Sequence, residues 1–420
     1  MCSPSQGKNM HSALVIGGAG FLGSHVVEQL VNHGEYVVSV FDIQEPNDES
    51  RVSGVTYVQG SVVDATSIAN VIKELQPLIV LHTASPVHGL PPKIYYEVNE
   101  TGTQNVISAC RAAGVKKLIY TSSTGVVWTG AEFNGVSEDQ INFPAKGYDA
   151  YHHTKGLGER LILAAEGHDG MQTVIIRPCG MTGERDKQLI WRLAEVYDKK
   201  QHRVQIGDNT NLVDYAYAGN VAHAHVLACE KLIADPDLVS GQTFFITNGE
   251  PLPQNENTAS TSGISVSLSQ SHQGSRDKNV CGTFNSASTS TSTPLLLPVY
   301  TPQFNRFGWD RCRSNRTRQT FFITNGEPLP QWDFSRMIWK ELGDDGNGRV
   351  TVIPRFVGLI MASLAEIFCR ITGSSTQFTK FSVRYLTGTQ WYNIDKADVL
   401  GYKPNVSLEE GIKRTVKVCF

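Results

Sequence analysis

The fold of this chain is decided by the stretch Gly17-Gly18-Ala19-Gly20-Phe21-Leu22-Gly23. It follows the apolar run Ala13–Ile16 and continues into Ser24–Leu30, whose residues predict a helix. The glycines therefore form the turn between a strand and a helix. Glycines without side chains let a pyrophosphate approach the backbone, and amides at a helix N-terminus carry partial positive charge. The stretch predicts a dinucleotide-binding turn, with Gly17, Gly20, Phe21, Leu22 and Gly23 at the cofactor.

An acidic residue completes this fingerprint. Val37–Phe41 predicts the next strand, and Asp42 ends it 19 residues after Gly23, which is the expected spacing. A carboxylate there can accept hydrogen bonds from both ribose hydroxyls of NAD and would repel the 2′-phosphate of NADP. Because no arginine lies close by to offset that repulsion, Asp42 favours NAD. The alternative is an ordinary tight turn followed by a surface aspartate.

Short apolar runs alternate with helical stretches in the first half of the chain. The runs Val55–Val58, Ile79–Leu81, Lys117–Tyr120 and Thr173–Ile176 predict successive parallel strands. This alternation is typical of an α/β fold in which helices cover both faces of the sheet. We therefore expect a Rossmann-type, doubly wound parallel sheet.

Three polar residues suggest the chemistry. Ser123 follows a predicted strand, and Tyr151 and Lys155 come 28 and 32 residues later, four positions apart at the start of a predicted helix. Positions i and i+4 share one helix face. The pKa of a phenol must fall by about three units, which corresponds to roughly 4 kcal/mol, before the group can act as a base near pH 7. We expect the Lys155 ammonium to supply much of that shift, and the Ser123 hydroxyl to bind the oxygen of the reacting alcohol or ketone.

Each of these residues also has an ordinary structural interpretation. A serine after a strand is commonly a helix cap. His152 and His153 lie on other helix faces and are interpreted as solvated or packing residues, and His82 as a structural histidine at a strand end. The small Ala84 beside it would allow the cofactor to approach closely.

An exact duplication interrupts the chain. Gln242–Gln254 recurs without change as Gln319–Gln331, 77 residues further on. Between the copies, residues 255–318 contain twenty Ser or Thr and few apolar residues. Such a segment cannot bury enough apolar surface to order itself, so we expect a disordered, low-complexity insert. A gene duplication and an untrimmed intron both remain open as its origin.

Composition excludes several classes of protein. A chain of 420 residues with 40% hydrophobic content can build a sizeable core, and a net charge of −3 gives no basic footprint for nucleic acid. The eight cysteines form no CxxC pair, so neither a zinc site nor a secreted disulfide framework is expected, and no other metal cluster is indicated. The polar first twelve residues lack the apolar core of an export signal.

The motifs together resemble the 3β-hydroxysteroid dehydrogenase family of extended short-chain dehydrogenases, and most closely its decarboxylating sterol-4α-carboxylate members. Besides the glycine turn and the Tyr151–Lys155 pair, the resemblance is carried by Tyr120–Ser123, Arg177–Asp186, Asn220–His225 and Leu400–Pro404 with Glu409–Gly411. It spans nearly everything except the insert. The runs Arg177–Asp186 and Asn220–His225 are the ones most typical of sterol-type members.

The resemblance implies NAD-dependent oxidation of a 3β-hydroxyl on a 4-carboxysterol or a related polycyclic terpenoid, with decarboxylation of the resulting β-keto acid. It also implies that Ala84, Asn99, Tyr151, Lys155 and Pro178 contact the cofactor. The implied location is the cytoplasmic side of the endoplasmic reticulum membrane, or the cytoplasm. Peripheral membrane contact and a homodimer are further expectations.

Other functions stay open from the sequence. They are a terpenoid alcohol dehydrogenase of secondary metabolism that does not decarboxylate, a non-catalytic NAD-binding scaffold and a sugar-nucleotide epimerase. The intact Ser123, Tyr151 and Lys155 argue against the scaffold. Nothing in the second half resembles the nucleotide-binding residues of an epimerase.

Two positions depart from the family pattern. Ser61 stands where the family usually has an acidic residue at adenine, which implies weaker cofactor binding, and Gly219 replaces a usual acid before Asn220.

Further on, Phe356–Ala365 is an apolar run too short to span a bilayer, which needs about 20 apolar residues. It is expected to lie on a membrane, to cover an apolar substrate, or to be an ordinary buried helix.

The predicted domain organisation follows from these features. It comprises a polar tail (1–11), an NAD-binding domain (12–247, with 177–212 contributing to the substrate side), the insert between the two copies, and a smaller substrate-binding domain (332–420).

Overall fold

A seven-stranded sheet forms the centre of the fold. The computed structural model describes residues 10–46, 50–246, 328–374, 376 and 378–420. The strands run in the order β12-β7-β5-β4-β1-β2-β3, and all neighbours are parallel. The order reverses between β1 and β4, and sheets of this kind bind ligands at the carboxyl ends of the strands beside that reversal. The strands are β1 (His11–Ile16), β2 (Tyr36–Asp42), β3 (Thr56–Gln59), β4 (Ile79–His82), β5 (Lys117–Thr121), β7 (Gln172–Pro178) and β12 (Gln242–Ile246).

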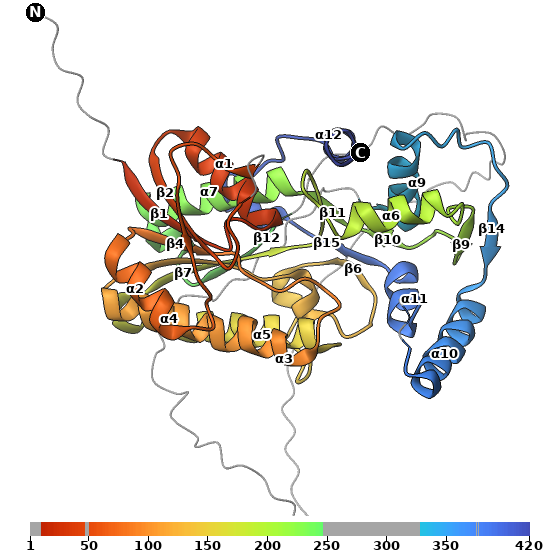
Figure 1. The fold of residues 1–420 in the computed structure, drawn as a ribbon, viewed down its shortest axis with the longest axis horizontal. Helices are drawn as coiled ribbons and strands as arrows, with labels where there is room; N and C mark the ends of the chain where they lie inside the picture. The colour runs from red at the N-terminus through yellow and green to blue at the C-terminus, as the bar shows by residue number, and fades with distance from the viewer. Residues whose placement is uncertain (1–9, 47–49, 247–327, 375, 377) are drawn as a thin grey trace, which may run out of the picture. The chain divides into compact units, whose positions relative to one another are not determined.

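Helices cover both faces of this sheet, which confirms the predicted doubly wound fold. Helices α1 and α7 pack together on one face, and α2, α4 and α5 lie on the other (Figure 1). Alternate residues of β1 enter two separate cores, Ala13 and Val15 one and Leu14 and Ile16 the other. This two-sided burial explains why the strands read as continuous apolar runs. The helices are α1 (Phe21–His33), α2 (Ala65–Leu75), α4 (Thr103–Ala113), α5 (Ala150–Ala165) and α7 (Ala218–Ala234).

Shorter elements build the second part of the fold. A four-stranded sheet has the order β13-β10-β15-β6, and β8 pairs with β11 and β9 with β14. A core that includes Ile190, Phe334 and Ile412 joins α6, α9 and α12. The strands are β6 (Phe133–Val136), β8 (Gly180–Thr182), β9 (Val204–Ile206), β10 (Leu212–Val213), β11 (Tyr215–Tyr217), β13 (Leu329–Pro330), β14 (Thr351–Ile353) and β15 (Gln390–Tyr392). The helices are α6 (Leu189–Asp198), α8 (Pro236–Val239), α9 (Gln331–Glu341), α10 (Arg355–Thr372), α11 (Lys380–Thr387) and α12 (Leu408–Cys419).

The two copies of the repeat contribute opposite ends to the fold. The start of the first copy, Gln242–Ile246, is β12 and pairs with β7. The end of the second copy supplies β13, which pairs with β10, and Gln331, which begins α9. The predicted disordered insert 255–318 lies outside the described residues. The described parts of the two copies thus supply β12, β13 and the start of α9 once each, as a single copy in an uninterrupted chain would.

Helix α10 contains the apolar run Phe356–Ala365, and the interpretation of this run as an ordinary buried helix is wrong. Gly358 and Ala362 are buried, but the large apolar side chains on the other side of the helix are exposed. Those side chains are Phe356, Ile360, Met361, Leu364, Ile367, Phe368 and Ile371. Across the described ranges, the structure contains no helix with the length and apolarity needed to cross a membrane.

Candidate active site

The glycine turn connects β1 to α1 and is packed too closely for side chains at Gly17 and Gly23. Gly17 has φ +84°, and a Cβ built on it would lie 2.6 Å from the backbone of Ala84. A Cβ on Gly23 would lie 2.0 Å from the carbonyl oxygen of Gly17. Helix α1 begins after Gly20 without a side-chain cap and has no acidic residue in its first turn. A close-packed turn that ends in an uncapped, acid-free helix N-terminus fits a pyrophosphate.

Asp42 is held in place at the end of β2. Its Oδ2 accepts a hydrogen bond from the amide of Ala19 (3.0 Å), and its Oδ1 accepts one from Gln44 (3.2 Å). Burial raises the pKa of this carboxyl group. Ser61 lies close to it, because the amide of the preceding Gly60 donates to the carbonyl of Asp42 (2.8 Å). Asp42 therefore stands beside the glycine turn, where a ribose would lie.

Lys155 is buried at the end of β5. Its Nζ donates a hydrogen bond to the carbonyl oxygen of Thr121 (2.5 Å) and lies 4.5 Å from the ring centroid of Tyr120. The Thr121 hydroxyl contacts Nε2 of His225 (2.8 Å), whose Nδ1 contacts the Val221 carbonyl (2.8 Å). Burial lowers the pKa of Lys155 to about 7, although the Glu159 carboxylate acts in the opposite direction.

Ser123 follows β5 and Tyr151 lies in the first turn of α5, and the two residues lie close together. Ser123 caps the short 3-10 helix η3 (Thr124–Val127), with its Oγ accepting from the Gly125 amide (3.1 Å). The Tyr151 phenol lies near enough to Ser123 and Ser85 for both hydroxyls to act to lower its pKa. The structure thus brings Ser123 and Tyr151 together and places Lys155 one helical turn further along α5. The cap interpretation of Ser123 and the catalytic one are compatible.

The expected lowering of the Tyr151 pKa is wrong for this structure. Desolvation raises the pKa of Tyr151 to about 12, although hydrogen bonds from Ser85 and Ser123 act in the opposite direction. The physical reason is that the phenolate would lose hydration while Lys155 directs its ammonium to the Thr121 carbonyl. In the ligand-free chain the Tyr151 phenol is therefore protonated near pH 7.

Asn99 is buried in an irregular helix beside the site. It lies in the π-helix η2 (Tyr96–Gly102), a type of distortion that is frequent at functional sites. Its amide donates to Oγ1 of Thr154 on α5 (3.0 Å), and its Oδ1 accepts from Ser85 (3.2 Å). Asn99 thus connects the serine that contacts Tyr151 to the helix that carries Tyr151.

Sequence reasoning missed a buried ion pair beneath the site. Both carboxylate oxygens of Glu159 accept from Nε of Arg177 (2.9 Å each), and Oε2 also accepts from Ser122 (2.5 Å). Both charged residues are almost fully buried. Glu159 follows Lys155 by one turn on α5. A charged residue, Arg177, near the end of the apolar strand β7 was the signal in the sequence that could have indicated this ion pair. Through the contact with Ser122, this ion pair fixes the segment that follows β5 against α5.

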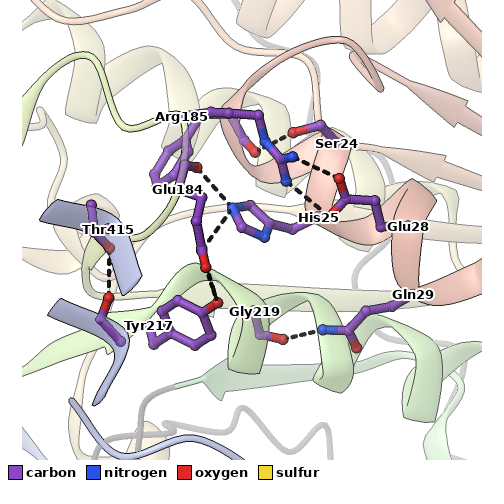
Figure 2. Close-up of polar contacts among 11 residues, drawn as sticks. Ser24, His25, Glu28, Gln29, Glu184, Arg185, Tyr217, Gly219 and Thr415 are labelled. Atoms are coloured by element: carbon purple, nitrogen blue, oxygen red, sulfur yellow. Dashed lines mark hydrogen bonds and ion pairs between the residues drawn. The ribbon is translucent and has the colours of Figure 1, made fainter. Parts of the chain in front are cut away.

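A second polar cluster connects α1 to the segment around Glu184 and Arg185 (Figure 2). Nε2 of His25 contacts the Glu184 carbonyl (3.0 Å), and the Glu184 carboxylate accepts from the Tyr217 hydroxyl (2.8 and 2.9 Å). Arg185 pairs with Glu28 through two bonds of 2.6 and 3.0 Å. These contacts give the run Arg177–Asp186 a structural role, because they orient helix α1, which begins at the glycine turn.

Gly219 is accommodated in the same cluster. The amide of Gln29 donates to its carbonyl oxygen (2.5 Å, Figure 2). A Cβ at this position would lie 2.4 Å from the ring of Tyr217. A larger residue at position 219 would therefore require Tyr217 to move.

The substrate side of the site is aromatic. Trp128, Tyr148, Phe381 and Tyr385 contact one another with ring centroids 4.6 to 5.9 Å apart, and we call them the aromatic cluster. Phe381 and Tyr385 come from α11. A small hollow begins at Thr124, next to Ser123, and is bounded by Tyr385 and Tyr392 but also by the polar side chains of Asp214, Gln331 and Gln390. Its walls therefore combine apolar rings with polar groups.

The other predicted residues take structural positions. His82 is buried, contacts Thr103 through Nε2 (3.1 Å), and has its pKa lowered to about 3 by burial. Nδ1 of the buried His152 lies 2.7 Å from Asp149, and Nδ1 of His153 accepts from the Gly147 amide (3.2 Å). Pro178 ends β7.

Comparisons with known proteins give a consistent result. The profile of the 3-beta hydroxysteroid dehydrogenase/isomerase family matches residues 14–273. The decarboxylating sterol-4-alpha-carboxylate 3-dehydrogenase of Schizosaccharomyces pombe is 33% identical over 97% of both chains. The human enzyme of the same name is 41% identical over 57% of this chain and 62% of its own. The solved structure of UDP-glucose 4-epimerase from Thermus thermophilus, complexed with NAD, superposes with a TM-score of 0.60 at 19% identity, covering 97% of this chain and 98% of that one, which shows the shared fold.

Proposed function

The chain belongs to the 3-beta hydroxysteroid dehydrogenase/isomerase family, and on that premise we propose that it oxidises the 3β-hydroxyl of a 4-carboxysterol with NAD and releases carbon dioxide. The observation that supports this most directly is the convergence of Ser123 and Tyr151 next to buried Lys155, at the sheet edge that also carries the glycine turn and Asp42. A relative that is similar over nearly its whole length supports the choice of substrate.

The residues have distinct roles in the proposed oxidation. Ser123 binds the oxygen of the reacting alcohol, and Tyr151 removes its proton as the C3–H bond breaks. Bound NAD would supply the hydride acceptor and a positive charge near the phenol. Gly17, Gly20, Phe21, Leu22 and Gly23 would hold its pyrophosphate, and Asp42 its adenosine ribose. Lys155, Ala84, Asn99 and Pro178 would line its nicotinamide half.

Decarboxylation follows from the product of this oxidation. A ketone at C3 makes the substrate a β-keto acid, and when its carboxylate leaves as carbon dioxide the electrons of the breaking carbon–carbon bond form an enolate. A proton from water added at C4 then restores the ketone. The sequence of steps therefore needs one two-electron oxidation and no second catalytic site.

A purified chain can be tested on three substrates. We expect NADH formation from a 4-carboxy-3β-hydroxysterol, slower formation from a terpenoid alcohol without a carboxyl group, and none from a UDP-sugar. Faster turnover of the terpenoid alcohol would favour the secondary-metabolite dehydrogenase. NAD binding without turnover of any of the three would indicate a scaffold.

Helix α10 supports peripheral contact with a membrane, which would supply an apolar substrate. Its seven exposed apolar side chains occupy one side of the helix, and residues 355–387 contain four basic residues and one acidic residue. Its buried side packs on α11, which carries Phe381 and Tyr385 of the aromatic cluster. A face of this kind suits an anionic bilayer surface, whereas pairing two copies would bring like charges together. The endoplasmic reticulum is the proposed location.

Vesicle flotation tests this contact. Replacing Ile360, Leu364 and Ile367 by Gln should reduce binding to phosphatidylcholine–phosphatidylserine vesicles and leave turnover of detergent-dispersed substrate unchanged. The control is Leu238→Gln, which changes an exposed leucine on α8. Unchanged flotation would refute the membrane face. A change from dimer to monomer in the triple variant would assign the face to a homodimer.

A further inference from the structure

His88 lies directly beside the proposed base. It belongs to the loop between β4 and α3 (Pro92–Tyr95), and its ring centroid lies 3.9 Å from that of Tyr151, with 47° between the ring planes. His88 and its neighbour Ser85 are both exposed, whereas Tyr151 is mostly covered. The imidazole therefore lies on the solvent-exposed side of the Tyr151 phenol. Sequence analysis assigned His88 no role.

Helix α6 holds this loop in place. The backbone amide of His88 donates to the side-chain oxygen of Gln188 (3.3 Å), which immediately precedes α6. Asp186 in turn accepts bonds from the amides of Gln188, Leu189 and Ile190 at 2.7 to 3.1 Å. The position of His88 is thus tied to a well-capped helix start.

Helix α6 also brings a positive charge to the same place. Arg192 lies one turn beyond Gln188, is exposed, and is close enough to His88 to lower its pKa. Arg192 forms no ion pair among the described residues, but its charge also acts to lower the pKa of the nearby Asp186 and Glu195 carboxyl groups. Partial desolvation and the nearby His152 lower the pKa of His88, so its ring is neutral near pH 7. A neutral imidazole keeps one N–H to donate.

The substrate of the proposed reaction places an anion at this point. Its carboxylate is attached to C4, the carbon adjacent to the one whose hydroxyl must reach Tyr151. The group that binds the carboxylate must therefore lie beside Tyr151 on the open side. Asp149 is the acidic residue close to His88, and its Oδ1 already contacts both the amide and the ring of His152 (2.8 and 2.7 Å).

We propose that His88 and Arg192 recognise the C4 carboxylate of the substrate, His88 by donating a hydrogen bond and Arg192 by supplying positive charge. This inference rests on the proposed function. It makes the loop that contains His88 the part of the site that separates carboxysterols from neutral sterols. Tyr151 and Ser123 act on the hydroxyl group, which both kinds of sterol share.

The test compares two substrates that differ only at C4, a 4-carboxy-3β-hydroxysterol and its 4-methyl counterpart. His88→Phe keeps a ring against Tyr151 and removes the N–H, and Arg192→Gln removes the charge. Each should lower kcat/KM for the carboxysterol about tenfold or more, because a hydrogen bond to a charged group is lost, and leave the 4-methyl sterol nearly unchanged. Arg192→Lys should restore part of the loss. Lys199→Gln, at the end of the same helix, is the control.

The outcomes separate this inference from the proposed function. An equal loss on both substrates would show that His88 only supports Tyr151, and an unchanged preference in both variants would also refute the inference. In either case, wild-type activity on the carboxysterol would leave the proposed function intact. A wild-type chain that does not oxidise the carboxysterol would overturn both.

Discussion

Nζ of Lys155 lies 2.5 Å from the carbonyl oxygen of Thr121, so a buried ammonium is anchored to the end of β5 within the proposed site. This contact connects α5, which carries Tyr151, to the central sheet. It also accounts for a conflict with the sequence-based expectation, because the charge that was expected to ionise Tyr151 is itself disfavoured by burial.

The stability of the ligand-free chain should depend on pH through Lys155. Its pKa is about 7 when folded and near 10.5 when unfolded, so between these values the unfolded chain binds more protons and stability rises with pH. Relative to Lys155→Met, the wild type should gain about 2–3 kcal/mol in free energy of unfolding between pH 7 and 9. Urea denaturation of both proteins across this range measures it. A constant difference would mean that Lys155 is not buried as a titrating group.

Tyr151→Phe should bind NADH like the wild type and lose nearly all turnover. The change removes the acid–base group and leaves the glycine turn and Asp42 untouched. Fluorescence titration with NADH and steady-state kinetics provide the two readouts. Turnover within about threefold of the wild type would remove Tyr151 from the mechanism.

Cofactor preference should change when the charge beside β2 is reversed. Asp42→Ala combined with Ile43→Arg removes the carboxylate that Ala19 holds in place and adds a cation suited to a 2′-phosphate. The ratio of kcat/KM for NADP to that for NAD should rise. Asp42→Ala alone is the matched control, and an unchanged ratio in the double variant would show that Asp42 does not contact the ribose.

Deleting residues 242–318 should preserve the fold and raise solubility and activity. Because the copies are identical, this deletion leaves one complete segment, whose start supplies β12 and whose end supplies β13 and the beginning of α9. Long insertions cost little closure entropy, so the full chain should also fold. Yield, thermal unfolding and activity of both chains should be compared. A folded but inactive deletion variant would show that the insert is functional.

The sequence predicted the sheet well because its central strands, β1, β4, β5 and β7, are buried on both faces. Runs such as Ala13–Ile16 and Thr173–Ile176 can satisfy two cores only as continuous apolar strands. The glycine turn was equally readable, since the backbone at Gly17 and Gly23 leaves no room for a Cβ. Ser123, Tyr151 and Lys155 followed from spacing.

What the sequence could not show depends on long-range contacts. His88 lies in a polar loop, and its position depends on the ring of Tyr151 and on the side-chain oxygen of Gln188, 100 residues away. The pKa of Tyr151 is raised rather than lowered for a similar reason, because the burial of its phenol depends on the whole fold. Helix α10 was recognised as an apolar run, but only packing on α11 shows which of its sides is left exposed.

The most direct test of the central claim is the ratio of carbon dioxide to NADH formed from a 4-carboxy-3β-hydroxysterol carrying a labelled carboxyl carbon. The proposed chemistry predicts one labelled carbon dioxide for each NADH, and neither product from Tyr151→Phe. NADH without labelled carbon dioxide would contradict the claim and indicate a dehydrogenase that leaves the carboxyl group in place.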